Sequence, residues 1–375
     1  MSKALWLAAA LFPSERNYEM HANCSGFPSE APKVGNPEAT KAREEWIDVL
    51  RGLAILMLLV LHRNTLPGIR TYLNSFLMPL FFAISGYLFH PERHPKVLPF
   101  IGSRAVRLLL PYVFFSLLSI PYEIWYAWRM EVPWDKTWLA DMLDKLLVLH
   151  GEVLSNSPVW FLPSLFSVEL VFFFVARIHG KRMMLIALAC FAGLGYILSA
   201  HIWPYPKLLF WNANFSAILL CFYGFGYLLR DWIGKVDLCR LMLCVSLSLT
   251  IGLWGQLWGN RLIYYYLQRS PMDFILFHAQ ALSSIIAFFT VARIMPSYSF
   301  LQYLGRNSML LFGAHFVVYQ AFDLVNRKLR LDTPEPILSL YVVVTALAVL
   351  VPCCEVVNRY FPWVVGNRSR CRKPL

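Results

Sequence analysis

Charged residues are scarce in this sequence. Asp, Glu, Lys and Arg make up 15% of its 375 residues, whereas hydrophobic residues make up 58%. A soluble domain needs more polar side chains than this to cover its surface. Apolar runs of about 18 to 22 residues recur along nearly the whole chain, and each is long enough to cross a bilayer core of roughly 30 Å. The composition therefore predicts an all-α polytopic membrane protein.

Cysteine patterns typical of disulfide or metal chemistry are also missing. The eight cysteines lie mostly inside apolar runs, and they form no Cys-x-x-Cys pair. This spacing indicates neither a disulfide framework nor a metal site. We interpret the cysteines as packing residues and expect no metal.

We expect about ten transmembrane helices with uncertain edges. An even number of helices places both termini on the same side of the membrane. Cytoplasmic loops are enriched in Lys and Arg, and the loops on the side of the termini hold roughly twice as many of these residues as the opposite loops. Both termini are therefore predicted to be cytoplasmic. The ten segments lie near 47–66, 74–90, 108–128, 158–178, 183–202, 213–230, 238–258, 272–294, 307–325 and 336–354.

The net charge of +12 raises the possibility of a nucleic-acid partner. However, the basic residues are dispersed over short loops and concentrated on one membrane face, which is the pattern that topology produces. We therefore expect membrane lipid as a partner and no nucleic acid. Some of the same charges remain candidates for binding phosphate groups.

Long polar segments are confined to the ends of the chain. Residues 1–45 are mixed and aperiodic, and their apolar run 4–12 is too short to span a bilayer. We expect a flexible cytoplasmic extension, or a start codon placed too early, rather than a signal peptide, because no clear cleavage site follows the run. Residues 46–355 are predicted to form the membrane domain and residues 356–375 a basic cytoplasmic tail. Between the third and fourth segments, residues 135–150 alternate apolar and charged side chains at helical spacing, which predicts a helix on the outer membrane surface.

Arg51 and His62 lie in the first apolar segment with ten residues between them. Helical geometry places them on one face of the helix, about 16 Å apart. Arginine in a spanning segment costs on the order of 2.5–3.5 kcal/mol at the helix centre, so such residues usually lie near an end or have a function. Asp48, one turn earlier, is positioned to orient the guanidinium. A lone histidine of this kind is more often a hydrogen-bonded helix-end residue, but Arg51 on the same face favours a catalytic pair with His62 as general base.

Arg104 and Arg107 stand three positions apart just before the third segment. Guanidinium groups bind phosphate bidentately, and together with Arg51 at the same depth the pair indicates a site for a phosphate-bearing cofactor. Anchoring of the helix at the cytoplasmic surface is the simpler interpretation of either residue alone. Ser85 and Gly86, inside the second segment, fit either a tight helix packing joint or the wall of the same cavity.

Three further residues are candidates for binding substrate. Glu169 and His315 are predicted within spans, where a polar or charged side chain is costly unless it has a partner or lines a cavity. Trp160 lies at the outer end of the fourth segment, where tryptophan commonly belongs to the aromatic belt but can also stack on a sugar. Glu123 and His278 are weaker candidates of the same kind.

Taken together, these segments resemble the membrane acyltransferase-3 family over residues of about 45–354. The resemblance is carried by Asp48-Val-Leu-Arg-Gly-Leu-Ala through His62, by Phe81-Phe-Ala-Ile-Ser-Gly-Tyr87, by Arg104 with Arg107, and by Leu304-Gly-Arg-Asn-Ser308. The most specific element is the spacing of Arg51 and His62 followed by the Ser-Gly-Tyr segment. The length and single-module build are similar to bacterial exopolysaccharide acetyltransferases, including those that decorate xanthan-like polymers.

The resemblance implies transfer of an acetyl group, usually from cytoplasmic acetyl-CoA as co-substrate, to a sugar hydroxyl of an exopolysaccharide or another envelope glycan. His62 matches the essential histidine of the family and Arg51 its paired basic residue, while Arg104 and Arg107 match positions expected to meet the phosphates of coenzyme A. The implied acceptor is a glycan or a lipid-linked oligosaccharide. The implied location is the bacterial inner membrane, where the protein would associate with the polysaccharide assembly machinery.

Two other classes of function stay open at this point. A transporter or flippase for sugars or lipid-linked oligosaccharide would also have many spans and isolated membrane charges, although such folds often carry inverted repeats and no convincing repeat is visible here. A sensor or scaffold without chemistry would leave Arg51 and His62 on one helix face without an explanation.

Overall fold

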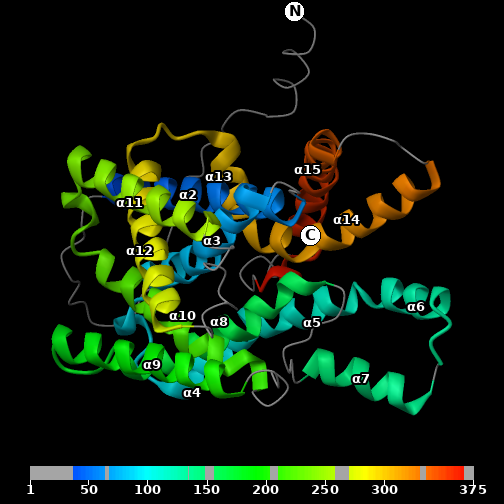
Figure 1. The fold of residues 1–375 in the computed structure, drawn as a ribbon, viewed down its shortest axis with the longest axis horizontal. Coiled ribbons are helices and arrows are strands. Elements are labelled where there is room, and N and C mark those ends of the chain that lie inside the picture. Colours follow the sequence, from blue (N-terminus) through cyan, green and yellow to red (C-terminus); the bar gives the residue numbers. More distant parts are fainter. Residues whose placement is uncertain are drawn as a thin grey trace, which may run out of the picture. The chain divides into compact units, whose positions relative to one another are not determined.

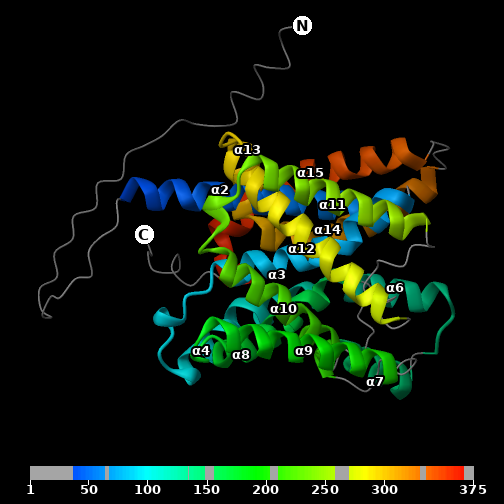
Figure 2. The same ribbon diagram turned by 60° about the vertical axis from the view of Figure 1, so that its left-hand side comes forward.

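The computed structural model describes residues 37–63, 67–133, 135–147, 156–202, 210–257, 270–329 and 335–366. Within these ranges the regular structure is helical, and no strand occurs. The chain divides into compact units at residues 1–41 and 42–375. The second unit holds the helices that build the site, and most of its long helices run in broadly the same direction (Figure 2).

Every apolar segment predicted from the sequence falls on a helix or on a broken run of helices (Figure 1). Seven helical segments in the described part of the chain are long and apolar enough to cross a membrane. The protein is therefore an all-α polytopic membrane protein. The long helices of the described chain, which are not the same set as these seven segments, are α2 (Pro37–Arg63), α3 (Pro67–Tyr87), α8 (Phe161–Val175), α9 (Lys181–Ile202), α10 (Ala213–Leu229), α11 (Leu238–Leu257), α12 (Pro271–Ile294), α14 (Ser308–Leu329) and α15 (Glu335–Tyr360).

The predicted third segment is broken rather than continuous. Its predicted bounds 108–128 fall on the end of the single π turn η2 (Ala105–Leu109), on α5 (Leu110–Leu117) and on α6 (Ile120–Arg129), and α4 (Val97–Arg104) precedes them. Pro111 and Pro121 explain the breaks in part, because proline lacks the N–H that continues an α-helical ladder. Helix α7 (Lys136–Leu147) then follows α6 at the edge of the unit, where residues 135–150 were predicted to form a surface helix (Figure 1).

Helix α3 is at the centre of the packing and contacts α10, α11 and α12. Its crossing with α10 is close because each helix has a glycine at the contact. A Cβ atom added to Gly86 would overlap the carbonyl oxygen of Tyr223, and one added to Gly226 would overlap the carbonyl oxygen of Ala83. Small residues at such crossings let helix backbones approach in the absence of a hydrophobic driving force between helices.

A second glycine-mediated crossing joins α2 to the short helix α13 (Ser299–Arg306). A Cβ atom at Gly52 would overlap the carbonyl oxygen of Leu301, and one at Gly305 would overlap that of Asp48. This crossing places the segment that contains Arg306 directly beside the Asp48–Arg51 turn of α2, which determines one wall of the site.

Candidate functional site

A cavity of about 460 Å³ lies where the ends of several helices meet. Its wall comes from α2, from the last turns of α3, from η2, from α8, from the junction of α13 with α14, and from the end of α15. Five of the residues predicted for the site line this cavity. They are Arg51, Ser85, Arg104, Arg107 and Glu169. Arg306 also lines the cavity, so four guanidinium groups from the described part of the chain share it.

The π turn η2 determines how two of these arginines are presented. Arg104 is the last residue of α4, and Arg107 lies inside the turn, where the N–H of Leu110 bonds to the carbonyl of Ala105 five residues back. Pro111 has no N–H to give to the carbonyl of Arg107, so an ordinary α-helical turn cannot close at this point. Turns of this kind recur at functional sites. The π turn was not predicted from the sequence.

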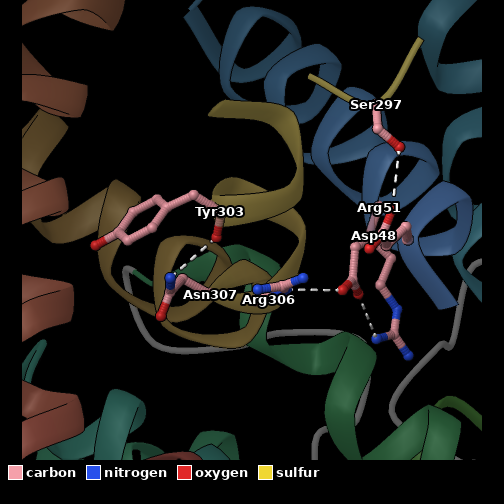
Figure 3. Close-up of polar contacts among 7 residues, drawn as sticks. Asp48, Arg51, Ser297, Tyr303, Arg306 and Asn307 are labelled. Atoms are coloured by element: carbon pink, nitrogen blue, oxygen red, sulfur yellow. Dashed lines mark hydrogen bonds and ion pairs between the residues drawn. The ribbon is translucent and has the colours of Figure 1, made fainter. Parts of the chain in front are cut away.

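Asp48 holds two of the four arginines (Figure 3). Its Oδ2 accepts a hydrogen bond from Nε of Arg306 at 3.0 Å, and its Oδ1 lies 3.8 Å from a guanidinium nitrogen of Arg51. The contact with Arg51 was expected from the i, i+3 spacing. The contact with Arg306 was not, because that residue lies on α13 and reaches Asp48 only through the glycine crossing described above.

Glu169 pairs with the third arginine. Its Oε2 lies 3.2 Å from Nε of Arg104, and both side chains are largely buried, with exposed fractions of 6% and 12%. Burying one of these charges alone would be costly, so each stabilises the other inside the protein. Glu169 was predicted to bind substrate, and the structure places it in the cavity wall as the counter-ion of Arg104.

His94 lies at the edge of the same region, in the connection between α3 and α4. One of its ring nitrogens, Nε2, is 3.3 Å from a guanidinium nitrogen of Arg104. Burial lowers the pKa of His94, and the nearby Arg104, Arg93 and Arg177 lower it further. The neutral imidazole is therefore favoured, and in this form Nε2 accepts a hydrogen bond from Arg104.

Two asparagines that were not predicted as site residues also line the cavity, one of them directly after Arg306 in the chain. Asn307 and Asn358 both line the cavity, and Nδ2 of Asn358 donates to Oδ1 of Asn307 at 2.6 Å. Nδ2 of Asn307 in turn donates to the carbonyl of Tyr303 at 2.9 Å (Figure 3). Asn358 comes from the far end of α15, so no local pattern in the sequence could have linked it to Asn307.

His62 and His315 form a pair outside this cavity. Nδ1 of His62 lies 2.8 Å from Nε2 of His315, and the two rings are nearly parallel at an angle of 14°. His315 is fully buried, and the adjacent Arg63 is bound by Asp323 of α14 through both carboxylate oxygens. The structure thus joins two residues predicted separately, one as a base and the other as a substrate-binding residue.

Phe312 contacts both the cavity and the histidine pair. It lines the cavity, and its ring centroid is 6.4 Å from that of His315. The rings of Phe161 and Phe81 pack against it at 5.2 Å and 6.5 Å and also line the cavity. Arg51 therefore lines the cavity, whereas His62 does not, and Phe312 contacts His315, the partner of His62.

Trp160 is not brought to the same place. It lines a small apolar pocket with Pro79, Phe215 and Phe277, which is separate from the arginine-lined cavity. The weaker candidate His278 is enclosed by the rings of Phe222 and Phe274, at centroid distances of 5.0 and 4.2 Å. Among the described residues, neither His278 nor Glu123 lines the large cavity.

The arrangement combines two chemical elements. Four guanidinium groups around one cavity suit an anion that carries several phosphates. A histidine with a fixed hydrogen-bond partner suits proton transfer to or from a hydroxyl group. The apolar part of the cavity wall includes Ile84, Leu165 and Phe312, and Phe312 in turn contacts His315.

Comparison with known proteins gives a match to the Acyl_transf_3 family model, described as an acyltransferase domain, over residues 44–354. No curated protein and no solved structure matches the chain. The matched range includes every residue predicted for the site, from Arg51 to His315.

Proposed function

Because this chain belongs to the acyltransferase-3 family of membrane acyltransferases, we propose that it transfers an acetyl group from cytoplasmic acetyl-CoA to a glycan hydroxyl. The acceptor is a sugar of an exopolysaccharide or another envelope glycan, or its lipid-linked precursor. The protein acts in the bacterial inner membrane, in association with the machinery that assembles the polymer. The observation that carries this proposal is the single cavity that gathers Arg51, Arg104, Arg107 and Arg306.

The donor binds through its phosphates. The ends of α2, α3, α14 and α15 that line the cavity belong to the side predicted to be cytoplasmic, where acetyl-CoA is found, whereas α8 lines it from its predicted outer end at Phe161 to Glu169. Arg107 and Arg306 are the more exposed of the four arginines and receive the phosphates first, while Arg104 and Arg51 lie deeper beside their carboxylate partners. Asn307 and Asn358, which also line the cavity, offer hydrogen bonds to the nucleotide.

The thioester arm then extends along the apolar wall of the cavity towards His62. Phe312 lines the cavity and contacts His315, the partner of His62, so we expect that side chain to rotate as the arm passes. The acetyl group thereby crosses part of the bilayer without movement of the charged end of the donor.

The chemical step is acyl transfer with His62 as general base. The imidazole takes the proton of the acceptor hydroxyl as the sugar oxygen attacks the thioester carbonyl, which gives a tetrahedral oxyanion. The carbonyl reforms as the carbon–sulfur bond breaks. The thiolate leaves and takes the proton from the imidazolium, so that the products are the O-acetyl sugar and coenzyme A. A route through an acyl-histidine, followed by transfer to the sugar, has the same overall balance.

The test is acetyl transfer by the purified full-length protein in liposomes, with radiolabelled acetyl-CoA and envelope glycan as acceptor. We expect label in the glycan with the wild-type protein and with Arg293→Ala, and none with His62→Ala. Arg293 is a suitable control because it lies at the end of α12 and does not line the cavity. Proton NMR of the glycan from cells with and without the gene gives the acetylated position. Undiminished labelling with His62→Ala would remove this residue from the mechanism, and glycan movement without label would favour a transporter.

A further inference from the structure

The hydrogen bonds of His315 determine where its proton lies. Nδ1 of His315 is 2.7 Å from the carbonyl oxygen of Phe312 and 3.1 Å from that of Leu311. A carbonyl oxygen only accepts hydrogen bonds, so Nδ1 of His315 carries a proton. A neutral imidazole has one N–H group, and Nε2 of His315 is therefore an acceptor.

The surroundings favour the neutral form of His315. The residue is fully buried, and a buried imidazolium without a carboxylate partner is costly. The groups that face the pair are the cations Arg63 and Arg70, the carboxylate Asp323 and the hydroxyl of Tyr319. Asp323 is bound to Arg63, and the Tyr319 hydroxyl donates to the carbonyl of Leu59 at 2.9 Å.

The assignment of His315 determines that of His62. Because Nε2 of His315 accepts, Nδ1 of His62 must donate across the 2.8 Å that separates them. The proton of a neutral His62 is then on Nδ1, and the free lone pair is on Nε2. This is the same logic by which the second ring nitrogen of a metal-binding or catalytic histidine is fixed by its hydrogen-bond partner.

We propose that His315 is a positioning residue that holds His62 in the tautomer protonated on Nδ1, so that Nε2 is the atom that takes the proton of the acceptor hydroxyl. His315 thus acts through His62 and does not itself contact the substrate, which differs from the substrate-binding role expected from the sequence. This inference rests on the proposed acyl transfer for its catalytic consequence. The tautomer of His62, however, is a property of the protein alone.

The first measurement needs no activity. Nitrogen-15 NMR of histidine-labelled full-length protein in lipid distinguishes the two neutral tautomers, and the His62 signals are identified by their loss in His62→Gln. We expect His62 to be protonated on Nδ1 in the wild type and to lose this preference in His315→Phe, which keeps an aromatic ring among Phe312, Phe316 and Tyr319. Protonation of His62 on Nε2 in the wild type would overturn the inference, whether or not the protein transfers acetyl groups.

The second measurement compares turnover in matched variants. We expect His315→Phe to lower kcat about 100-fold, in the range typical of a lost general base, with an unchanged KM for acetyl-CoA because His315 does not line the donor cavity. His315→Gln retains an acceptor near the position of Nε2 and should recover kcat to within about tenfold of the wild type. The control His278→Phe alters another enclosed histidine, whose Nδ1 also meets a carbonyl one turn back, and should leave kcat unchanged.

Equal loss of kcat in His315→Phe and His315→Gln would show that the residue only packs, and the positioning role would be wrong. If His315→Phe does not yield folded protein, His315→Gln alone decides. The proposal is contradicted if His62 keeps its native tautomer in His315→Gln and kcat of this variant still falls much more than tenfold. Absence of transfer by the wild type contradicts the proposed function instead, and the NMR result then still decides the tautomer.

Discussion

Asp48 and Arg306 are joined by a hydrogen bond of 3.0 Å although 258 positions separate them in the chain. The bond places a guanidinium of α13 in the wall of a cavity whose other arginines come from α2, from the end of α4 and from η2. It also gives Asp48 two cationic partners, so that one carboxylate sets the position of both Arg51 and Arg306.

Replacement of Arg306 should weaken donor binding. We expect Arg306→Ala to raise the KM for acetyl-CoA about tenfold with little change in kcat, because an exposed guanidinium contributes a charge-assisted but solvent-screened contact to phosphate. Arg293→Ala serves as the control. Steady-state kinetics over a range of donor concentrations makes the comparison, and an unchanged KM would exclude Arg306 from the donor site.

The Arg104–Glu169 pair should show strong energetic coupling. Glu169→Leu leaves Arg104 buried without its counter-ion, which we expect to cost on the order of 3–5 kcal/mol. The double variant Arg104→Met with Glu169→Leu should be more stable than Glu169→Leu alone, because no unpaired charge remains. Thermal unfolding in detergent of the wild type, Glu169→Leu, Arg104→Met and the double variant gives the coupling. Additive effects would show that the 3.2 Å contact contributes nothing specific.

The glycine crossing of α3 and α10 should not tolerate a methyl group. We expect Gly226→Ala to destabilise the protein by about 1–3 kcal/mol, because its Cβ would overlap the carbonyl oxygen of Ala83. The matched control is Gly193→Ala in α9, where an added Cβ has nothing within 4 Å and the gain in helix propensity should leave stability unchanged or raised. Melting temperatures in detergent test the pair, and equal values for both variants would contradict the crossing.

His94 should make stability depend on pH. Its pKa is lowered in the folded protein by burial and by Arg104, so the unfolded chain binds more protons when the pH falls below the ordinary histidine value of about 6.5. The contribution of His94 is therefore intact above that value and is lost as the pH decreases. We expect the fall in melting temperature between pH 7.5 and pH 5.5 to be smaller in His94→Gln, which stays neutral. An identical fall in both proteins would show that His94 plays no part.

The membrane class and the position of the helices followed from the sequence. Long apolar runs must be helical in lipid, because only a helix satisfies the backbone of a single segment there, so composition and run length sufficed. The local pairing of Asp48 with Arg51 followed in the same way, since helical spacing is a property of neighbouring residues. The clustering of Arg51 with Arg104 and Arg107 was anticipated from their common depth.

Only the tertiary structure decided which distant residues meet. Arg306 and Asn358 enter the site through a glycine crossing and through the end of α15, and neither approach has a periodic signature. The π turn at Arg107 depends on the packing of its neighbours as well as on Pro111. The partnership of His62 with His315, and the ring of Phe312 between that pair and the cavity, depend on side-chain packing between helices, which the one-dimensional pattern of apolar residues does not encode.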